Sequence, residues 1–375
     1  MRKILYLAAS MAVLITSCNF HREAIVTTPP AERLQHRIDT LRNHGYMFGH
    51  QDDPFYGTTW AYCKDSSDTK LVTGDYPAVM GFELGGIEMG DEKNLDSVPF
   101  TLIREEAIKH YLRGGIITFS WHPRNPLTGG TTWDVSDTTV VENILPGGSQ
   151  AEKFALWMER VATFLETIKS KEGRRIPFIL RPFHEYNGSW FWWGEKLCTA
   201  EQYRAMWNLF QDYMNEKLPT NIVWSFSPNL QGNWTEEKFL ERYPGNDRVF
   251  LIGCDAYQWG TEEDFVNGLR SDLTFLNEFA QKAGKPIALT ECGIQNSPDP
   301  TWWTRVLKPI CDDFPISYML PWRNYPAEHF GPAPDLCTKD DFIKFYEAPN
   351  TLFLEDVKPG KNMTLGRDSS EIIWM

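Results

Sequence analysis

The chain has 375 residues, which is enough for one large domain with a sizeable core. Its formal net charge is −13, and it has no Lys/Arg cluster beyond the extreme N-terminus, so nucleic acids and other anionic polymers are poor candidate partners. Aromatic residues make up 14% of the chain and include 15 Trp, which is typical either of a rich core or of a cleft that binds carbohydrate.

The N-terminus has the pattern of an export signal. A basic start at residues 2–3 precedes an apolar stretch at residues 4–15, and small residues then lead to Cys18. The apolar stretch is too short to span a membrane. The pattern resembles the signal of bacterial lipoproteins, so we expect residues 1–17 to be a signal peptide and Cys18 to be lipidated. An ordinary cleaved signal with an incidental cysteine is the alternative.

Residues 18–30 indicate a short tether between this anchor and a folded domain. One acidic residue, Glu23, follows closely after the cysteine. Lipoproteins that some Gram-negative bacteria export to the cell surface tend to carry acidic residues there. We therefore expect a lipid anchor in the outer membrane, with the periplasmic face favoured over the cell surface.

Past the tether, short apolar runs alternate with longer segments of helical periodicity. Eight runs are predicted to be strands: residues 46–49, 78–83, 115–121, 177–183, 222–227, 249–257, 286–291 and 316–322. Eight strands, each followed by a helix, predict a single (β/α)8 TIM barrel of the α/β class at residues 31–360, with a C-terminal tail at residues 361–375. An open doubly wound sheet is the alternative, but it would usually show a Gly-rich phosphate loop after its first strand, and residues 49–53 form none.

Several helix starts are visible as capping patterns. We predict them at Ser149, Thr199, Thr261, Asp299 and Thr338. In a barrel, the long connections at residues 50–77, 84–100 and 122–148 all follow strands, so they are expected to decorate the C-terminal face, where active sites of this fold lie.

Polar or aromatic side chains follow seven of the eight predicted strands. They are Glu83, His122, His184 with Glu185, Ser227 with Asn229, Asp255 with Tyr257, Glu291, and Trp322 with Arg323. Because the C-terminal ends of the strands meet at one face of a barrel, these side chains are expected to converge there.

The densest group lies at residues 175–194. A buried strand ends in Arg181, His184 and Glu185, and the loop after it contains Trp190. Sugar rings stack on indoles while their hydroxyls need charged and amide partners, so this segment indicates a sugar-cleaving site. A structural ion pair in a Trp-rich core is the alternative. Of the adjacent residues at 192–193, at most one is expected to face the cleft.

Two carboxylates could perform the chemistry, Glu185 after the fourth strand and Glu291 after the seventh. Glycoside hydrolysis needs one protonated acid for the leaving oxygen and one ionised carboxylate for the anomeric carbon. Aromatic surroundings should raise the pKa of Glu185, which suits the acid. Either Arg181 or Arg323 could keep Glu291 ionised as the nucleophile.

The segment Arg181-Pro-Phe-His-Glu-Tyr-Asn-Gly188 resembles glycoside hydrolase family 26, a (β/α)8 family dominated by β-1,4-mannanases, and the resemblance extends over about residues 44–346. It implies a retaining mechanism with Glu185 as acid/base and Glu291 as nucleophile. Members usually carry Met where this chain has Tyr186, a difference expected to alter the cleft wall locally.

The resemblance also implies a set of substrate-binding residues. His122 and His184 would flank the sugar being cleaved, and Trp190 would stack on the leaving-group side. On the other side, Trp322 would form the floor of the glycone sugar and Arg323 would make a contact further out. The rest of the set is Tyr257, which would hydrogen-bond the nucleophile, Asp255, which would support it, and Arg181 and Asn229.

The implied substrates are mannan, galactomannan or glucomannan, cleaved to manno-oligosaccharides or mannobiose. A same-family hydrolase of mixed-linkage β-glucan or β-1,3-xylan is one alternative, and an inactive lipid-anchored glycan-binding protein is another. Whether the connections at residues 50–77 and 122–148 block the glycone end would decide between endo and exo action.

No cofactor or metal is expected, because the His and Cys residues show no ligand spacing. We expect a monomer, with Cys254 and Cys292 as buried thiols. Residues 88–92 are expected to form a solvated acidic loop.

Overall fold

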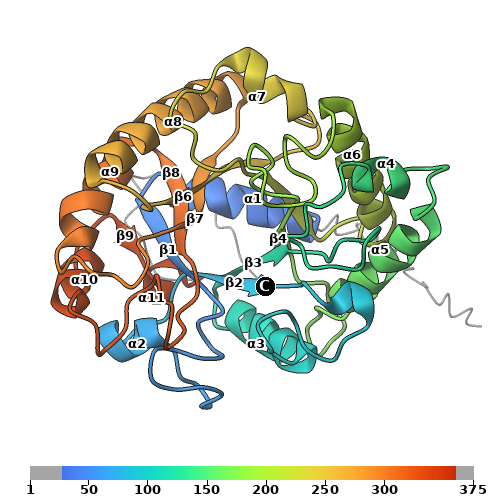
Figure 1. The fold of residues 1–375 in the computed structure, drawn as a ribbon. Helices are drawn as coiled ribbons and strands as arrows, with labels where there is room; N and C mark the ends of the chain where they lie inside the picture. Colours follow the sequence, from blue (N-terminus) through green and yellow to red (C-terminus); the bar gives the residue numbers. More distant parts are fainter. Residues whose placement is uncertain (1–27, 360–375) are drawn as a thin grey trace, which may run out of the picture.

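The computed structural model describes residues 28–359. Eight parallel strands follow one another around a closed barrel, because β8 pairs with β1 and β1 pairs with β2. Helices surround the barrel as an outer ring (Figure 1). The strands are β1 (Tyr46–Gln51), β2 (Val79–Glu83), β3 (Ile116–Trp121), β4 (Phe178–Pro182), β5 (Ile222–Phe226), β6 (Leu251–Tyr257), β7 (Ile287–Gly293) and β8 (Ile316–Pro321). The predicted (β/α)8 barrel is confirmed, and each of the eight predicted strands overlaps an observed one.

Helical segments precede β1 and follow the strands, and all but α1 lie around the outside (Figure 1). They are α1 (Pro30–Leu41), α2 (Asp68–Thr73), η1 (Ile87–Met89), α3 (Phe100–Leu112), α4 (Val140–Ile144), α5 (Ala151–Glu166), α6 (Ala200–Lys217), α7 (Glu236–Arg242), α8 (Glu262–Ala283), η2 (Trp303–Leu307), α9 (Lys308–Asp313), α10 (Lys339–Tyr346) and α11 (Leu354–Val357). A short strand, β9 (Thr351–Leu352), pairs with β1 outside the barrel. None of the helices within residues 28–359 is long and apolar enough to cross a membrane.

The predicted helix starts have mixed outcomes. Thr199 forms the full capping box of α6, and the Thr261 side chain caps α8, as predicted. The prediction at Ser149 is wrong, because the N-cap of α5 is the next residue and makes no side-chain cap hydrogen bond. Thr338 is the N-cap residue of α10, without a side-chain hydrogen bond. Asp299 accepts from the backbone of Thr301 within a turn, and the helical segment begins after it.

The N-terminal end of the barrel is closed by α1, which lies inside the ring of outer helices (Figure 1). Its apolar face packs against side chains that point into the barrel from the strands. This cluster includes Leu34, Ile38, Leu41, Met47, Val79, Ile116, Ile179, Val223, Leu251, Ala288 and Tyr318. A closed apolar floor leaves the opposite, C-terminal end as the open one.

Strand alternation delivers polar side chains to that open end. Along β6, residues 251, 253, 255 and 257 point inward, from the apolar Leu251 at the floor to Asp255 and Tyr257 at the mouth. Gly253 lies between them because there is no room for a side chain: a Cβ atom there would approach the Thr290 Oγ1 to 2.4 Å. The interior thus changes from apolar to polar over the length of one strand.

The six cysteines between residues 28 and 359 are free thiols. Cys254 and Cys292 are fully buried, as predicted. Burial raises the pKa of both thiols, so they act as small core residues.

Candidate active site

A cavity of about 520 Å³ opens at the C-terminal face of the barrel. It is lined by eight residues that were predicted for the site: Glu185, Glu291, His122, Trp190, Asn229, Tyr257, Trp322 and Arg323. Three other residues that were predicted for the site, Arg181, His184 and Asp255, have buried side chains beneath this lining. Cys18 lies outside the described residues. The strand-end residues therefore converge in two layers, one exposed to the cavity and one supporting it.

Arg181 is the centre of the supporting layer. Its guanidinium donates to Glu291 Oε1 and, at 2.9 Å, to Asp255 Oδ2. Of the two arginines considered from the sequence, Arg181 is thus the one that contacts Glu291. A buried charge of this kind is stable only when paired and hydrogen-bonded, and Arg181 meets both conditions.

Asp255 holds Arg181 rather than contacting Glu291 directly. It accepts hydrogen bonds from Ser227 at 2.9 Å and from Thr290 at 2.6 Å. Burial raises the pKa of Asp255 to about 7, against the lowering effect of the Arg181 charge.

Glu291 is aimed into the cavity by an irregularity in β7. The pairing of β6 with β7 shifts between Cys254 and Asp255, so that β7 has one more residue than β6 at this point. Such a bulge re-aims the side chain that follows it. The carboxylate of Glu291 is then held at its second oxygen, because the Tyr257 hydroxyl donates to Oε2 at 2.7 Å.

Glu185 lies in a different environment, on a strained turn after β4. Phe183 and Glu185 both have positive φ, at 48° and 53°, a conformation that is costly for residues other than glycine. The Trp190 indole donates to Glu185 Oε2 at 2.7 Å. Burial raises the pKa of Glu185 well above its usual range, and the charge of Glu291 raises it further.

A chain of buried hydrogen bonds fixes the two histidines. Glu83 Oε2 lies 2.8 Å from His122 Nδ1, and His122 Nε2 lies 2.9 Å from His184 Nε2. Burial alone would lower the pKa of His122, but the charge and hydrogen bond of Glu83 outweigh it and raise the pKa. Burial and the Arg181 charge lower the pKa of His184 well below its usual range. Glu83, His122 and His184 therefore form one hydrogen-bonded chain beside the cavity.

The aromatic loop after β4 agrees with the prediction that at most one of Trp192 and Trp193 faces the cavity. Trp190 is 40% exposed and lines the cavity, and Gly188 leaves room for it, because a Cβ there would lie 2.4 Å from the indole. Trp192 and Trp193 are both fully buried, with their indole N–H groups bonded to backbone carbonyls. Neither faces the cavity; their neighbour Phe191 does.

Tyr186 does not alter the cleft wall as expected. The ring is buried and stacks on Phe226 at 4.9 Å, away from the residues that line the cavity. The substitution relative to the usual Met is accommodated in the aromatic core beneath the loop.

The acidic segment at residues 88–92 is likewise only partly solvated. Asp91 and Glu92 are exposed as expected, but Glu88 is fully buried and that part of the prediction is wrong. Its carboxylate accepts from the Trp121 indole at 3.1 Å and from the backbone N–H of Arg124 at 2.8 Å. Glu88 thereby ties η1 to the end of β3.

Trp322, Arg323 and Asn229 complete the predicted lining. The Trp322 ring lies edge-on to His122, with centroids 5.9 Å apart. Arg323 pairs with Asp96 at 2.9 Å, which links the loop after β8 to the loop after β2. Asn229 is held by the Asn187 side chain, which accepts from its backbone N–H at 2.8 Å.

Several lining residues were not predicted from the sequence. Trp133 and Trp259 are exposed by 52% and 66%, and Trp133 stacks over His122 while Trp259 stacks on Tyr257. The other members of this set are Leu95, Asp96, Phe191, Glu328 and Phe330. Trp259 could have been found from its position two residues after a strand-end tyrosine. Nothing local distinguishes Trp133 within its long loop.

The chain is similar to known proteins over most of its length. Residues 27–323 match glycosyl hydrolase family 26. It is 30% identical over 317 residues to a mannan endo-1,4-beta-mannosidase of Bifidobacterium adolescentis, covering 77% of this chain and 31% of that protein. It is 29% identical over 305 residues to a mannan endo-1,4-beta-mannosidase of Thermothelomyces thermophilus, covering 74% of this chain and 57% of that protein. The chain thus spans about a third and just over half of the length of these two relatives.

A solved structure extends the similarity to the fold. The structure of a GH26 beta-mannanase from Bacteroides ovatus is 44% identical in sequence, with a TM-score of 0.86. The match covers 88% of this chain and 96% of that one.

Proposed function

The chain belongs to glycosyl hydrolase family 26, and from that membership we propose that it hydrolyses β-1,4-mannosidic linkages in mannan, galactomannan or glucomannan. Two sequence relatives and one structural relative are named as mannanases, which supports this substrate class. The reaction would proceed by double displacement with retention, releasing manno-oligosaccharides or mannobiose.

The observation that carries the proposal is the asymmetry of two carboxyl groups in one cavity. Glu185 has a raised pKa and remains protonated at higher pH than an ordinary carboxyl group, which suits protonation of a leaving oxygen. Glu291 lines the same cavity, and it accepts hydrogen bonds from the Arg181 guanidinium at one oxygen and from the Tyr257 hydroxyl at the other. Different environments for two carboxyl groups are what glycoside hydrolysis requires.

The cavity also has the walls that a sugar chain needs. Trp190, Trp259 and Trp322 offer indole faces around it, while Asn229 and Arg323 offer hydrogen-bond donors for hydroxyls. The loops containing Leu95 and Trp133 contribute to the lining, whereas no residue of the connection at 50–77 does so. Any restriction of the cavity would then come from the loops after β2, β3 and β8, which contribute Leu95, Trp133 and Arg323 to its lining.

A substrate panel tests the proposed specificity. We expect release of reducing sugars from linear mannan and glucomannan, and little from lichenan or β-1,3-xylan. Matched Glu185→Gln and Glu291→Gln variants should release little from any of them. A preference for lichenan or xylan would instead support a different specificity within the family. Binding of mannan without hydrolysis would support a glycan-binding protein.

We further propose that the chain is attached to the outer membrane through lipidated Cys18, on the periplasmic side. The support is the signal pattern at residues 1–17. Cys18→Ala should move the protein from the membrane to the soluble fraction with its specific activity unchanged, as measured by fractionation and mannan hydrolysis. A variant that still sediments with membranes would refute the anchor.

A further inference from the structure

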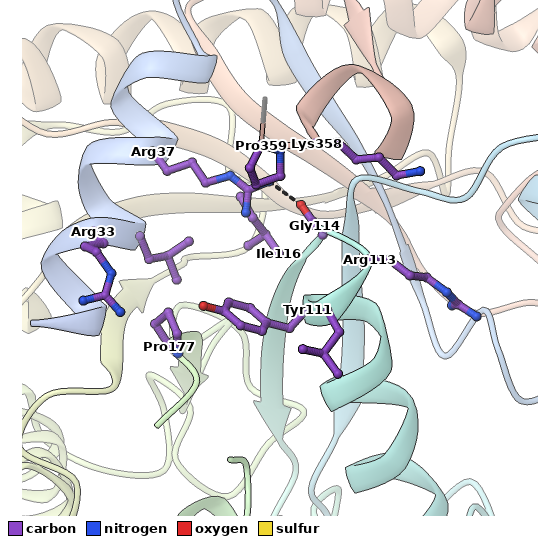
Figure 2. Close-up of a pocket in the computed structure, with 12 residues that line it drawn as sticks. Arg33, Arg37, Tyr111, Arg113, Gly114, Ile116, Pro177, Lys358 and Pro359 are labelled. Carbon is purple, nitrogen blue, oxygen red and sulfur yellow. Dashed lines mark hydrogen bonds between the residues drawn. The ribbon is translucent and has the colours of Figure 1, made fainter. Parts of the chain in front are cut away.

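A second cavity, of about 420 Å³, lies at the N-terminal face of the barrel, away from the candidate active site. It is bounded by α1, the end of α3 and the last described residues (Figure 2). Its lining is Arg33, Leu34, Arg37, Tyr111, Leu112, Arg113, Gly114, Gly115, Ile116, Pro177, Lys358 and Pro359. Nothing in the proposed hydrolysis uses these residues.

The charge of this cavity is opposite to that of the chain. Four of the lining residues are basic, namely Arg33, Arg37, Arg113 and Lys358, and none is acidic. The whole chain has 37 Lys and Arg against 50 Asp and Glu. A pocket with only basic charges is therefore not a reflection of the overall composition, and it creates a local positive potential.

Two of the four cations have no carboxylate partner within residues 28–359. Arg37 donates to the carbonyl oxygens of Gly114 and, at 2.8 Å, Val357, and Arg33 donates to the carbonyl of Thr28. In contrast, Arg113 pairs with Asp65 and Lys358 with Glu355.

Arg37 is the less solvated of the two unpaired cations. Its burial lowers the pKa of the guanidinium to about 10, because desolvation disfavours the charged form. Carbonyl oxygens orient the side chain but supply no negative charge. A buried charge is normally balanced by a counter-charge, and Arg37 has no such counter-charge among the described residues.

The rest of the pocket suits an amphiphilic ligand. The Tyr111 hydroxyl points toward Arg33 in Figure 2 and has no hydrogen-bond partner among the described residues. Leu34, Ile116 and Pro177 supply apolar surface, and Leu112 is 60% exposed at the rim. A shallower groove that shares Leu112 and Arg113 continues the pocket along the surface. Its other charged residues are Arg104, Lys109, Lys169, Lys171 and one acid, Glu105.

We propose that this pocket binds a phosphate group, carried either by a lipid headgroup or by free phosphate. The planar guanidinium donors of Arg33 and Arg37 match phosphate oxygens, and the Tyr111 hydroxyl supplies a further donor. The ligand would provide the counter-charge that Arg37 lacks. The exposed Leu112 beside the pocket favours a headgroup whose acyl chains lie over the rim. This site does not depend on the proposed hydrolytic activity.

Calorimetric titration of the full chain carrying Cys18→Ala tests the proposal. The probes are inorganic phosphate and monomeric dihexanoylphosphatidylglycerol. Both should bind, and Arg37→Gln should weaken binding roughly tenfold or more, as expected when a charged hydrogen bond is lost. Arg33→Gln and Tyr111→Phe should weaken it less. Arg270→Gln is the matched control, because it removes an arginine of α8 that pairs with Asp313 outside the pocket.

The outcomes separate the two ligand sources. Tighter binding of the lipid than of phosphate identifies a headgroup site, and equal affinities identify a site for free phosphate. Absence of binding by both probes overturns the proposal, as does a loss in Arg270→Gln equal to that in Arg33→Gln. Arg37 also ties α1 to the end of α3, so thermal unfolding of each variant is measured in parallel. If Arg37→Gln unfolds, the Arg33 and Tyr111 variants decide alone.

Discussion

Replacement of Glu185 by alanine should reduce the hydrolysis of mannan by roughly 10²–10⁴-fold, the contribution typical of a general acid. Much of the activity on an aryl β-mannoside with a good leaving group should survive, because such a leaving group departs without protonation. The structural reason is the raised pKa of Glu185 in its buried, aromatic position. The measurement is kcat/KM for both substrates in the wild type and in Glu185→Ala.

The pH profile supplies an independent test of the same assignment. An acid catalyst acts in its protonated form, so activity on mannan should fall as pH rises through the pKa of Glu185. Because that pKa is raised, the fall should occur at higher pH than for an ordinary glutamic acid. In Glu185→Ala acting on the aryl substrate, this alkaline limb should disappear. If Glu185→Ala lost the same factor of activity on both substrates and kept the alkaline limb, Glu185 would not be the acid catalyst.

The barrel and the convergence of its strand ends could be predicted because both follow from local patterns. Apolar runs of strand length alternate with capped helices, and parallel strands with helical crossovers then permit few architectures. This geometry brings Glu185, after β4, and Glu291, in β7, to the same face of the barrel. The final direction of each side chain is set locally, by the strained turn after β4 and by the bulge in β7.

Contacts that link distant segments around the site could not be predicted in the same way. Glu88 belongs to an acidic segment that looks solvated, and its burial depends on Trp121 and Arg124, which are distant in sequence. Arg181 was one of two arginines that the sequence offered as a partner of Glu291, and the choice between them depends on tertiary packing. Such features are set by tertiary packing, and a single sequence carries little signal for them.

The positions of side chains in the loops could also not be predicted from local patterns. The connection at residues 122–148 was expected at the C-terminal face, and it does lie there, but the position of Trp133 over His122 is a property of the folded loop. Tyr186 illustrates the opposite error: its place in a site motif suggested the cleft wall, yet its ring stacks on Phe226 in the core. Nearness in sequence to a reactive residue does not determine which way a side chain points.

The largest loss of activity is expected for Glu291→Ala. Both steps of a double displacement pass through an ester with this carboxylate, so removing it should lower activity on every substrate, on the order of 10⁴–10⁶-fold as for the loss of other nucleophiles. Added azide should restore turnover of an activated substrate by entering the vacated space, giving an α-glycosyl azide. Tyr257→Phe is the matched control: it keeps the carboxylate, removes only one of its hydrogen bonds, and should show no rescue by azide.

The anomeric configuration of the first product tests the nucleophile without any mutation. A β-linked substrate cleaved through two displacements yields the β-anomer first, which proton NMR detects in the first minutes, before mutarotation. An initial α-anomer would require a water molecule between the carboxyl groups and a separation of roughly 6.5–9.5 Å in place of 5–5.5 Å. Glu291 would then be a general base. The contacts from Arg181 and Tyr257 hold both oxygens of Glu291 in a fixed orientation inside the cavity, and a nucleophile that attacks the anomeric carbon directly needs such an orientation.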